Sequence, residues 1–155
     1  MSTPSTVASS ARIVVGVAAV VAALDWGTKA LATVALENDP VEIGSLITLR
    51  LSHNPGVAFG LGDRLPGPAL IALTATVTAV LAVTAIRGVF PSQVAAGLVL
   101  GGAVANLVDR VIGGTVVDFL DLGWWPSFNL ADAVLCVGCG LLVLQSFRAE
   151  RLQDA

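Results

Sequence analysis

The sequence has no tyrosine, a single histidine and only two cysteines among its 155 residues. A catalytic triad with a histidine base, or a metal site of several histidines, would depend on His53 alone. Cys136 and Cys139 lie in an apolar run without a second cysteine pair, so we interpret them as small packing residues. The composition therefore points away from thiol, imidazole and metal chemistry, and we expect no metal and no cofactor.

Charge is also scarce. Charged residues make up 12% of the chain, the net charge is -3, and no basic run suggests nucleic acid. In contrast, 55% of the residues are hydrophobic, which exceeds the usage of ordinary soluble domains. The chain is short enough for one domain, so we predict a single integral membrane domain over residues 1–155.

Four apolar runs are long enough to cross a bilayer as helices, which takes about 20 residues. The predicted helices are residues 13–36, 68–86, 92–108 and 130–147. The first run is longer than the core of a signal peptide and is interpreted as a retained helix. The second has no ionisable group and is expected to serve as scaffold. The third carries Gly97, Gly101 and Gly102, which favour close helix packing.

Basic residues near the helix ends predict the orientation. One side of the predicted bundle is flanked by Arg12, Arg87, Arg148 and Arg151. Acidic residues predominate on the other side, which also holds Arg50 and Arg64. We therefore predict that both termini are cytoplasmic and that the loops 38–66 and 109–129 face outward.

The stretch from Asn106 to Asp132 concentrates polar groups between two apolar runs. It holds four aspartates, one arginine and two asparagines. A charge at the centre of a membrane helix costs roughly 2.5 to 3.5 kcal/mol on insertion scales. Such groups persist mainly where they are paired, hydrated or used, so we interpret this stretch as an active site at a membrane surface.

Asp118 and Asp132 are the candidate catalytic pair, because each lies at the junction of a loop with a helix or extended segment. Two carboxylates close together share a proton, which provides one base to activate water and one acid for the leaving side. Asn129 and Arg110 are available as partners. Considered alone, however, Asn129 could be a helix N-cap and Asp132 could simply favour the helix dipole.

Further candidates lie on two other segments. Asp25 and Lys29 share a helical face and form either a structural ion pair or the rim of the site. Asn106, Asp109 and Arg110 also share a helical face, where a charge cluster at the helix end is the alternative for Asp109.

The outward loop contains one predicted strand. Polar and apolar residues alternate over residues 47–52, which favours a short strand. The next residues are Asn54, Pro55 and Gly56, which are residue types typical of a turn. The Asn54 amide can both donate a hydrogen bond to a peptide and accept one from it, so we expect Asn54 to bind peptide. His53 is expected to be a surface residue.

Five segments together resemble the lipoprotein signal peptidase family, the type II signal peptidases. Each segment is weakly specific alone, but the five occur in order in a chain of four predicted helices. They are Asp25-Trp26-Gly27-Thr28-Lys29, the segment 54–60, the segment 102–110, Val116-Val117-Asp118-Phe119 and Phe128-Asn129-Leu130-Ala131-Asp132. One departure is Ala105, where the family usually has glycine.

The resemblance implies an all-α membrane protein of four transmembrane helices, with a small extracytoplasmic β-sheet and loop over the site. It implies an intramembrane aspartic endopeptidase of the bacterial cytoplasmic membrane, which cleaves prolipoproteins before their diacylglyceryl-modified cysteine. Asp118 and Asp132 would be the catalytic pair, and Asp25 and Lys29 would support the site. Binding of substrate or support of the pair would fall to Asn54, Gly56, Asn106, Asp109, Arg110 and Asn129. Membrane lipid is an expected partner, and we expect a monomer.

Two rival functions use the same residues differently. A small transporter or proton-conducting protein could use Asp25 and Lys29 as a relay, but a relay needs polar groups along the depth of several helices. A non-catalytic assembly factor would not need two carboxylates with amides nearby. The clustering of polar groups at the predicted outer helix ends favours the peptidase.

Overall fold

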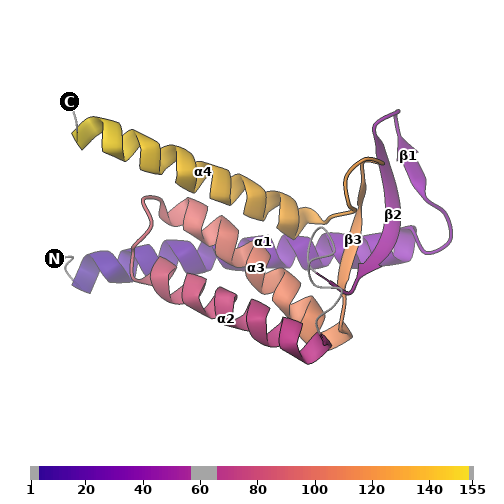
Figure 1. Cartoon of the computed structure of the whole chain (residues 1–155), viewed down its shortest axis with the longest axis horizontal. Helices are drawn as coiled ribbons and strands as arrows, with labels where there is room; N and C mark the ends of the chain where they lie inside the picture. Colours follow the sequence, from indigo (N-terminus) through magenta and orange to yellow (C-terminus); the bar gives the residue numbers. More distant parts are fainter. Residues whose placement is uncertain (1–3, 57–65, 154–155) are drawn as a thin grey trace.

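The computed structural model describes residues 4–56 and 66–153, so residues 57–60 of the second motif lie outside the described residues. Four helices run lengthwise, and a three-stranded sheet lies at one end of the bundle, called here the sheet end (Figure 1). The start of the first helix and the end of the last lie together at the opposite end. The elements are α1 (Pro4–Ala35), β1 (Val41–Ile43), β2 (Ile47–Asn54), α2 (Gly67–Ile86), α3 (Gln93–Gly113), β3 (Val116–Asp121) and α4 (Leu130–Gln153).

Each of the four helices contains a stretch that is long and apolar enough to cross a membrane. The prediction of four spanning helices and a small sheet is therefore confirmed, although three predicted ends are not. α1 begins before residue 13 and α4 continues beyond residue 147, because polar residues can extend a helix past its apolar run. α3 continues past residue 108 until Gly114, which has a φ of 73° and donates its N–H to the Arg110 carbonyl at 3.0 Å.

The start of α3 follows local capping. The Ser92 side chain accepts the N–H of Ala95 at 3.2 Å, which satisfies one of the free donors of the first turn. α2 begins directly after Pro66, and Pro68 lies in its first turn, where a missing N–H is tolerated.

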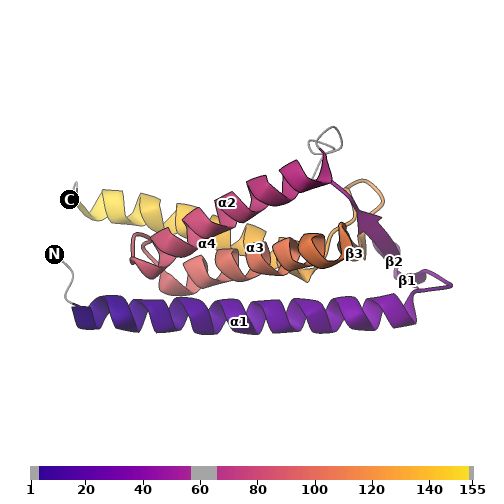
Figure 2. The ribbon, with the colours of Figure 1, turned by 90° about the horizontal axis from the view of Figure 1, so that it is seen from below.

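α3 is the central helix of the bundle and packs on the other three (Figure 2). A Cβ on Gly101 would lie 2.7 Å from the Val21 Cβ and 2.9 Å from the Ala18 carbonyl oxygen of α1. A Cβ on Gly102 would lie 2.6 Å from the Ala131 carbonyl oxygen of α4. The predicted face of small residues is confirmed, and it lets three helix backbones approach closely.

The sheet is antiparallel, with β2 between β1 and β3. His53 pairs with Val117, and Ser52 pairs with Asp118. Because neighbouring side chains on a strand point to opposite faces, Asn54 and Asp118 share one face, while His53 and Val117 share the other. The predicted strand is confirmed and extends as far as Asn54.

Candidate active site

Asn129 and Asp132 form a reciprocal cap at the start of α4. The Asp132 N–H donates to Asn129 Oδ1 at 2.9 Å, and the Asn129 N–H donates to Asp132 Oδ2 at 3.3 Å. This arrangement is a capping box. The simple prediction of an N-cap is therefore confirmed, and the same cap fixes the orientation of the Asp132 carboxylate at the positive end of a helix.

Asn129 joins the two candidate carboxylates, one through its side chain and the other through its backbone. Its side-chain Nδ2 donates to Asp118 Oδ1 at 2.7 Å, while its backbone N–H donates to Asp132 Oδ2 at 3.3 Å within the cap. The same Nδ2 lies 3.1 Å from Asn106 Oδ1 and 3.3 Å from the Val117 carbonyl oxygen. Asn129 is fully buried, so β3, α3 and α4 meet at this one side chain.

Asp118 is a buried carboxyl held by amides. Its side chain accepts Nδ2 of Asn54 at 3.1 Å as well as Nδ2 of Asn129, and the residue is 1% exposed. Burial raises the pKa of Asp118 from 3.8 to about 6; the Asn54 hydrogen bond opposes this rise and the charge of Asp132 adds to it. The hydrogen bond from Asn129 and the charge of Lys29 lower the pKa by smaller amounts. Near pH 6 the protonated and ionised forms of this carboxyl are therefore both populated.

Asp132 is held from α3. The Asn106 Nδ2 donates to Asp132 Oδ1 at 2.7 Å, and Asn106 itself is buried. Among the residues that the structure describes, no lysine, arginine or histidine forms an ion pair with Asp118 or Asp132. Both carboxylates are instead bound by neutral N–H donors.

A second charged group lies next to Asn106, and it is organised around Lys29. The Lys29 Nζ lies 2.6 Å from Asp25 Oδ2 and 2.7 Å from Asp109 Oδ2, and it donates to Asn106 Oδ1 at 3.0 Å. Asp25 also accepts the backbone N–H of Ala131 at 2.8 Å, which ties α1 to the first turn of α4. The predicted Asp25–Lys29 pair is confirmed, with Asp109 as a further partner.

Arg110 fixes the end of β2 and the turn after it. Its Nη2 donates to the Gly56 carbonyl at 2.8 Å, and its Nη1 donates to the Asn106 carbonyl at 3.2 Å. The Gly56 N–H donates to Asn54 Oδ1 at 2.9 Å, which turns the Asn54 amide nitrogen toward Asp118. Four predicted site residues are therefore connected by hydrogen bonds and hold the Asn54 amide against Asp118. They are Asn54, Gly56, Asn106 and Arg110.

A cleft of about 920 Å³ contains both candidate carboxylates. α2 contributes an apolar wall to this cleft, so it is more than the scaffold that its sequence suggested. Trp125 and Phe128 contribute a second wall. The sequence offered no signal for the role of α2, because its cleft side chains are Leu73, Thr74, Val77 and Thr78.

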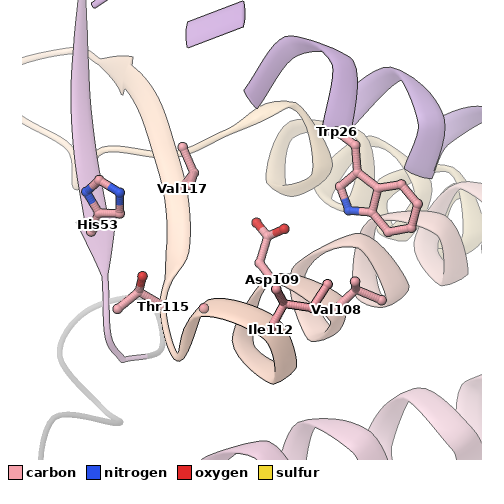
Figure 3. Close-up of a pocket in the computed structure, with 8 residues that line it drawn as sticks. Trp26, His53, Val108, Asp109, Ile112, Thr115 and Val117 are labelled. Atoms are coloured by element: carbon pink, nitrogen blue, oxygen red, sulfur yellow. The ribbon is translucent and has the colours of Figure 1, made fainter. Parts of the chain in front are cut away.

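A second cavity of about 510 Å³ lies between α1, the end of α3 and the opposite face of the sheet (Figure 3). The Asp109 carboxylate points into it between Trp26 and Val117, and His53 lies across from it on β2. Asp109 is therefore separated from the cleft, although it shared a predicted helical face with Asn106 and Arg110. His53 is exposed, as predicted.

The arrangement suits acid–base chemistry on a bound peptide. Asp118 and Asp132 line the same cleft, are joined through one asparagine and carry no counter-ion in the described part of the chain. No group of three or more His, Cys, Asp or Glu side chains converges as a metal site would among the described residues. The polar groups gather at the sheet end and do not follow the depth of the helices, which argues against a proton-conducting path.

Comparisons with known proteins agree with this geometry. A family model described as signal peptidase (SPase) II matches residues 17–148. A lipoprotein signal peptidase of Nitratidesulfovibrio vulgaris is 39% identical over 149 residues, covering 88% of this chain and 90% of the relative. One of Syntrophotalea carbinolica is 40% identical over 152 residues, covering 88% and 92%. A bacterial membrane enzyme solved by the in meso method at 2.3 Å has a TM-score of 0.75 at 27% identity, covering 92% of this chain and 91% of that one.

Proposed function

Because the chain belongs to the signal peptidase II family and is a membrane protease that processes prolipoproteins, we propose that Asp118 and Asp132 are its catalytic pair. The observation that carries this proposal is the shared cleft, in which Asn129 donates its side-chain N–H to one carboxylate and its backbone N–H to the other. Neither carboxylate has a cationic partner among the described residues.

The proposed reaction needs one shared proton. The ionised carboxylate takes a proton from water as the water oxygen adds to the scissile carbonyl carbon, and the protonated carboxyl gives its proton to the carbonyl oxygen. In the second step, the newly protonated carboxyl donates to the amide nitrogen, the C–N bond breaks, and the other carboxylate recovers a proton from the diol. Both carboxyls then have their starting protonation, so the cycle is balanced.

The neighbouring side chains have supporting roles in this proposal. Asn54, Asn106 and Asn129 orient the pair through their amide N–H groups. Arg110 lines the cleft, and its buried Nε has no hydrogen-bond partner in the described part of the chain. Gly56 fixes the turn that holds Asn54.

The cleft also suits a lipidated substrate. α2 and α4 both line it, with the apolar side chains of Leu73 and Val77 on α2 and of Leu135 on α4. We propose that these side chains bind the diacylglyceryl chains, which would contribute about 0.8 kcal/mol per buried CH₂. The scissile bond before the modified cysteine would then lie at the carboxylate pair, near the membrane surface.

The proposed orientation places the sheet end outside the cytoplasm. The support is the arginine distribution, together with the start of α1 and the end of α4 at the same end of the bundle. A reporter fused at Gly123 is expected to report an external location, and one fused after Ala155 a cytoplasmic one. All the proposed site residues come from one chain, so we propose a functional monomer.

The test is cleavage of one prolipoprotein, with and without its diacylglyceryl group, by purified enzyme in detergent. Cleavage of the lipidated form alone is expected, and Asp118→Asn serves as the inactive control. Equal cleavage of both forms would show that the lipid is not recognised. Undiminished cleavage by Asp118→Asn would contradict the assignment of the catalytic pair.

A further inference from the structure

The two members of the aspartate pair have different surroundings, although each accepts two N–H groups. Asp118 lies on a strand, and its donors are the Asn54 and Asn129 amides. Asp132 lies in the first turn of α4, where the helix dipole favours a negative charge. Its side-chain donor is Asn106, which in turn contacts the Lys29 ammonium.

Lys29 determines which way the Asn106 amide faces. An ammonium has three N–H donors and no acceptor. Here its Nζ forms ion pairs with Asp25 Oδ2 and Asp109 Oδ2 and donates a hydrogen bond to Asn106 Oδ1. Because Lys29 can only donate, the Asn106 oxygen must face it and the Asn106 NH₂ must face Asp132. The reversed amide would place its NH₂ against an ammonium and its oxygen against a carboxylate.

Asn129 alone would fix this amide less firmly. Its Nδ2 lies near three acceptors, Asn106 Oδ1, Asp118 Oδ1 and the Val117 carbonyl oxygen, but carries only two N–H groups. The Asp118 contact, at 2.7 Å, is the shortest of the three. The remaining N–H is shared between two longer contacts, so Lys29 is the stronger constraint on Asn106.

We propose that Lys29 is a positioning residue that, through Asn106, makes Asp132 the ionised base of the pair and leaves the shared proton on Asp118. This inference rests on the proposed catalytic pair and adds the identity of each partner. Asp132 takes the proton from water, and Asp118 donates its proton to the carbonyl oxygen. The pKa of Asp118, raised to about 6 by burial, agrees with its role as the proton holder.

Other charged groups also face the pair and contribute to the electrostatic potential at its two carboxyls. Asp25 approaches α4 through its contact with the Ala131 N–H. Asp109 forms an ion pair with Lys29, and its carboxylate points into the second cavity (Figure 3). Arg110 lines the cleft from α3, and His53 lines it from β2. Of these groups, Lys29 is the cation that reaches Asp132 through a single intervening amide.

The first experiment locates the proton without using activity. Infrared spectra are recorded in a detergent without carbonyl groups, with and without aspartate that is ¹³C-labelled at its side chain. At about pH 5, one unit below the Asp118 pKa of about 6, the protonated-carboxyl band is expected in Asp132→Asn and not in Asp118→Asn. The reverse pattern would overturn the assignment. A failure of the proposed function appears separately, as cleavage that survives in Asp118→Asn.

The second experiment tests Lys29 by the pH dependence of kcat/KM. In Lys29→Met the acidic limb of this pH profile, which reports ionisation of the base Asp132, is expected to move up by about one pH unit. Loss of a nearby opposite charge causes a shift of this size. Asp109→Asn keeps an acceptor for Lys29 and removes a negative charge, so the same limb should move down. This second variant leaves no unpaired carboxylate beside Lys29, so it serves if Lys29→Met does not fold. A limb that stays in place while the rate falls would show that Lys29 only holds the helices together.

Discussion

Two pairs of carboxylates lie within a few side chains of each other at the sheet end, and they differ in what binds them. Asp25 and Asp109 both contact the Lys29 ammonium, at 2.6 and 2.7 Å. Asp118 and Asp132 are bound by asparagine amides and a backbone N–H. The first pair is compensated by charge, whereas the second is solvated by neutral donors.

This difference separates structure from chemistry. A carboxylate next to a buried ammonium keeps its charge, because protonation would leave the cation without a partner. A carboxylate held by amides can be charged or neutral without breaking an ion pair, so its proton is available for transfer. Loss of a carboxylate from the first pair should therefore mainly lower stability, whereas loss of one from the Asp118–Asp132 pair should abolish activity. Lys29 connects the two pairs, because it also contacts Asn106. The following substitutions test that division.

The largest expected effect is the loss of activity in Asp118→Asn and in Asp132→Asn. Each should lower kcat by about four orders of magnitude, and the double variant should lose little more, because both residues act as one unit. Asp118→Asn should also be more heat-stable than the wild type at about pH 7.5. The folded pKa of about 6 lies above the unfolded value, so the stability contribution of Asp118 is present at low pH and is lost as the pH rises through 6. A Tm that falls in Asp118→Asn would mean that this carboxyl is also structural.

Asp25→Ala is expected to lose stability and to keep activity, which is the opposite of the result expected for Asp118→Asn. Removing one partner of a buried ion pair costs about 3 kcal/mol, and here the contact with the Ala131 N–H is also lost. Unfolding by denaturant should show this loss, while the remaining folded enzyme keeps measurable kcat. Asp25→Ala protein that is fully stable yet as inactive as Asp118→Asn would remove the distinction between the two pairs.

A smaller effect is expected when α1 and α3 are pushed apart. In Gly101→Ala the added Cβ would lie 2.7 Å from the Val21 Cβ, so the helices must separate and the Lys29–Asn106 contact must lengthen. We expect a loss of about 1–3 kcal/mol of stability, as overpacking commonly causes. Gly16→Ala on α1 is the matched control, because its Cβ would meet no atom within 4 Å. Equal stability of the two variants would contradict the close packing.

The smallest effect is expected for the cysteines. Both are exposed on α4, and Cys136 lines the cleft. The Cys136→Ala/Cys139→Ala variant should retain kcat within about threefold, since small buried or lipid-facing cysteines act as small apolar residues. Abolished cleavage in this variant, measured on lipidated precursor, would place thiol chemistry in the mechanism.

Much of the fold and part of the site could be predicted from the sequence. Hydrophobic length predicts four spanning helices, and the spacing of Asp25 and Lys29 predicts their ion pair. The alternation before His53 predicts β2. These features are local, because each depends on residues within one helix or strand.

The rest depends on contacts between distant segments, which spacing alone cannot predict. The Asp25 side chain accepts an N–H 106 residues away, and the sheet register brings Asn54 to Asp118. The N-cap considered as an alternative role for Asn129 is present, but its link to Asp118 requires β3 to lie beside α4. The placement of Asp109 in a different cavity follows from how α3 is rotated against α1, which its own sequence does not encode.

The measurement that tests the account most directly is kcat/KM of the purified enzyme on lipidated precursor across pH, with and without a strong chelator. One shared proton predicts a bell-shaped profile with two apparent pKa values that belong to the pair. The rate should fall as the pH rises past about 6, where Asp118 loses its proton, and the chelator should change nothing. A rate that keeps rising above this pH, or one that is lost on chelation and restored by a divalent metal, would contradict the shared proton.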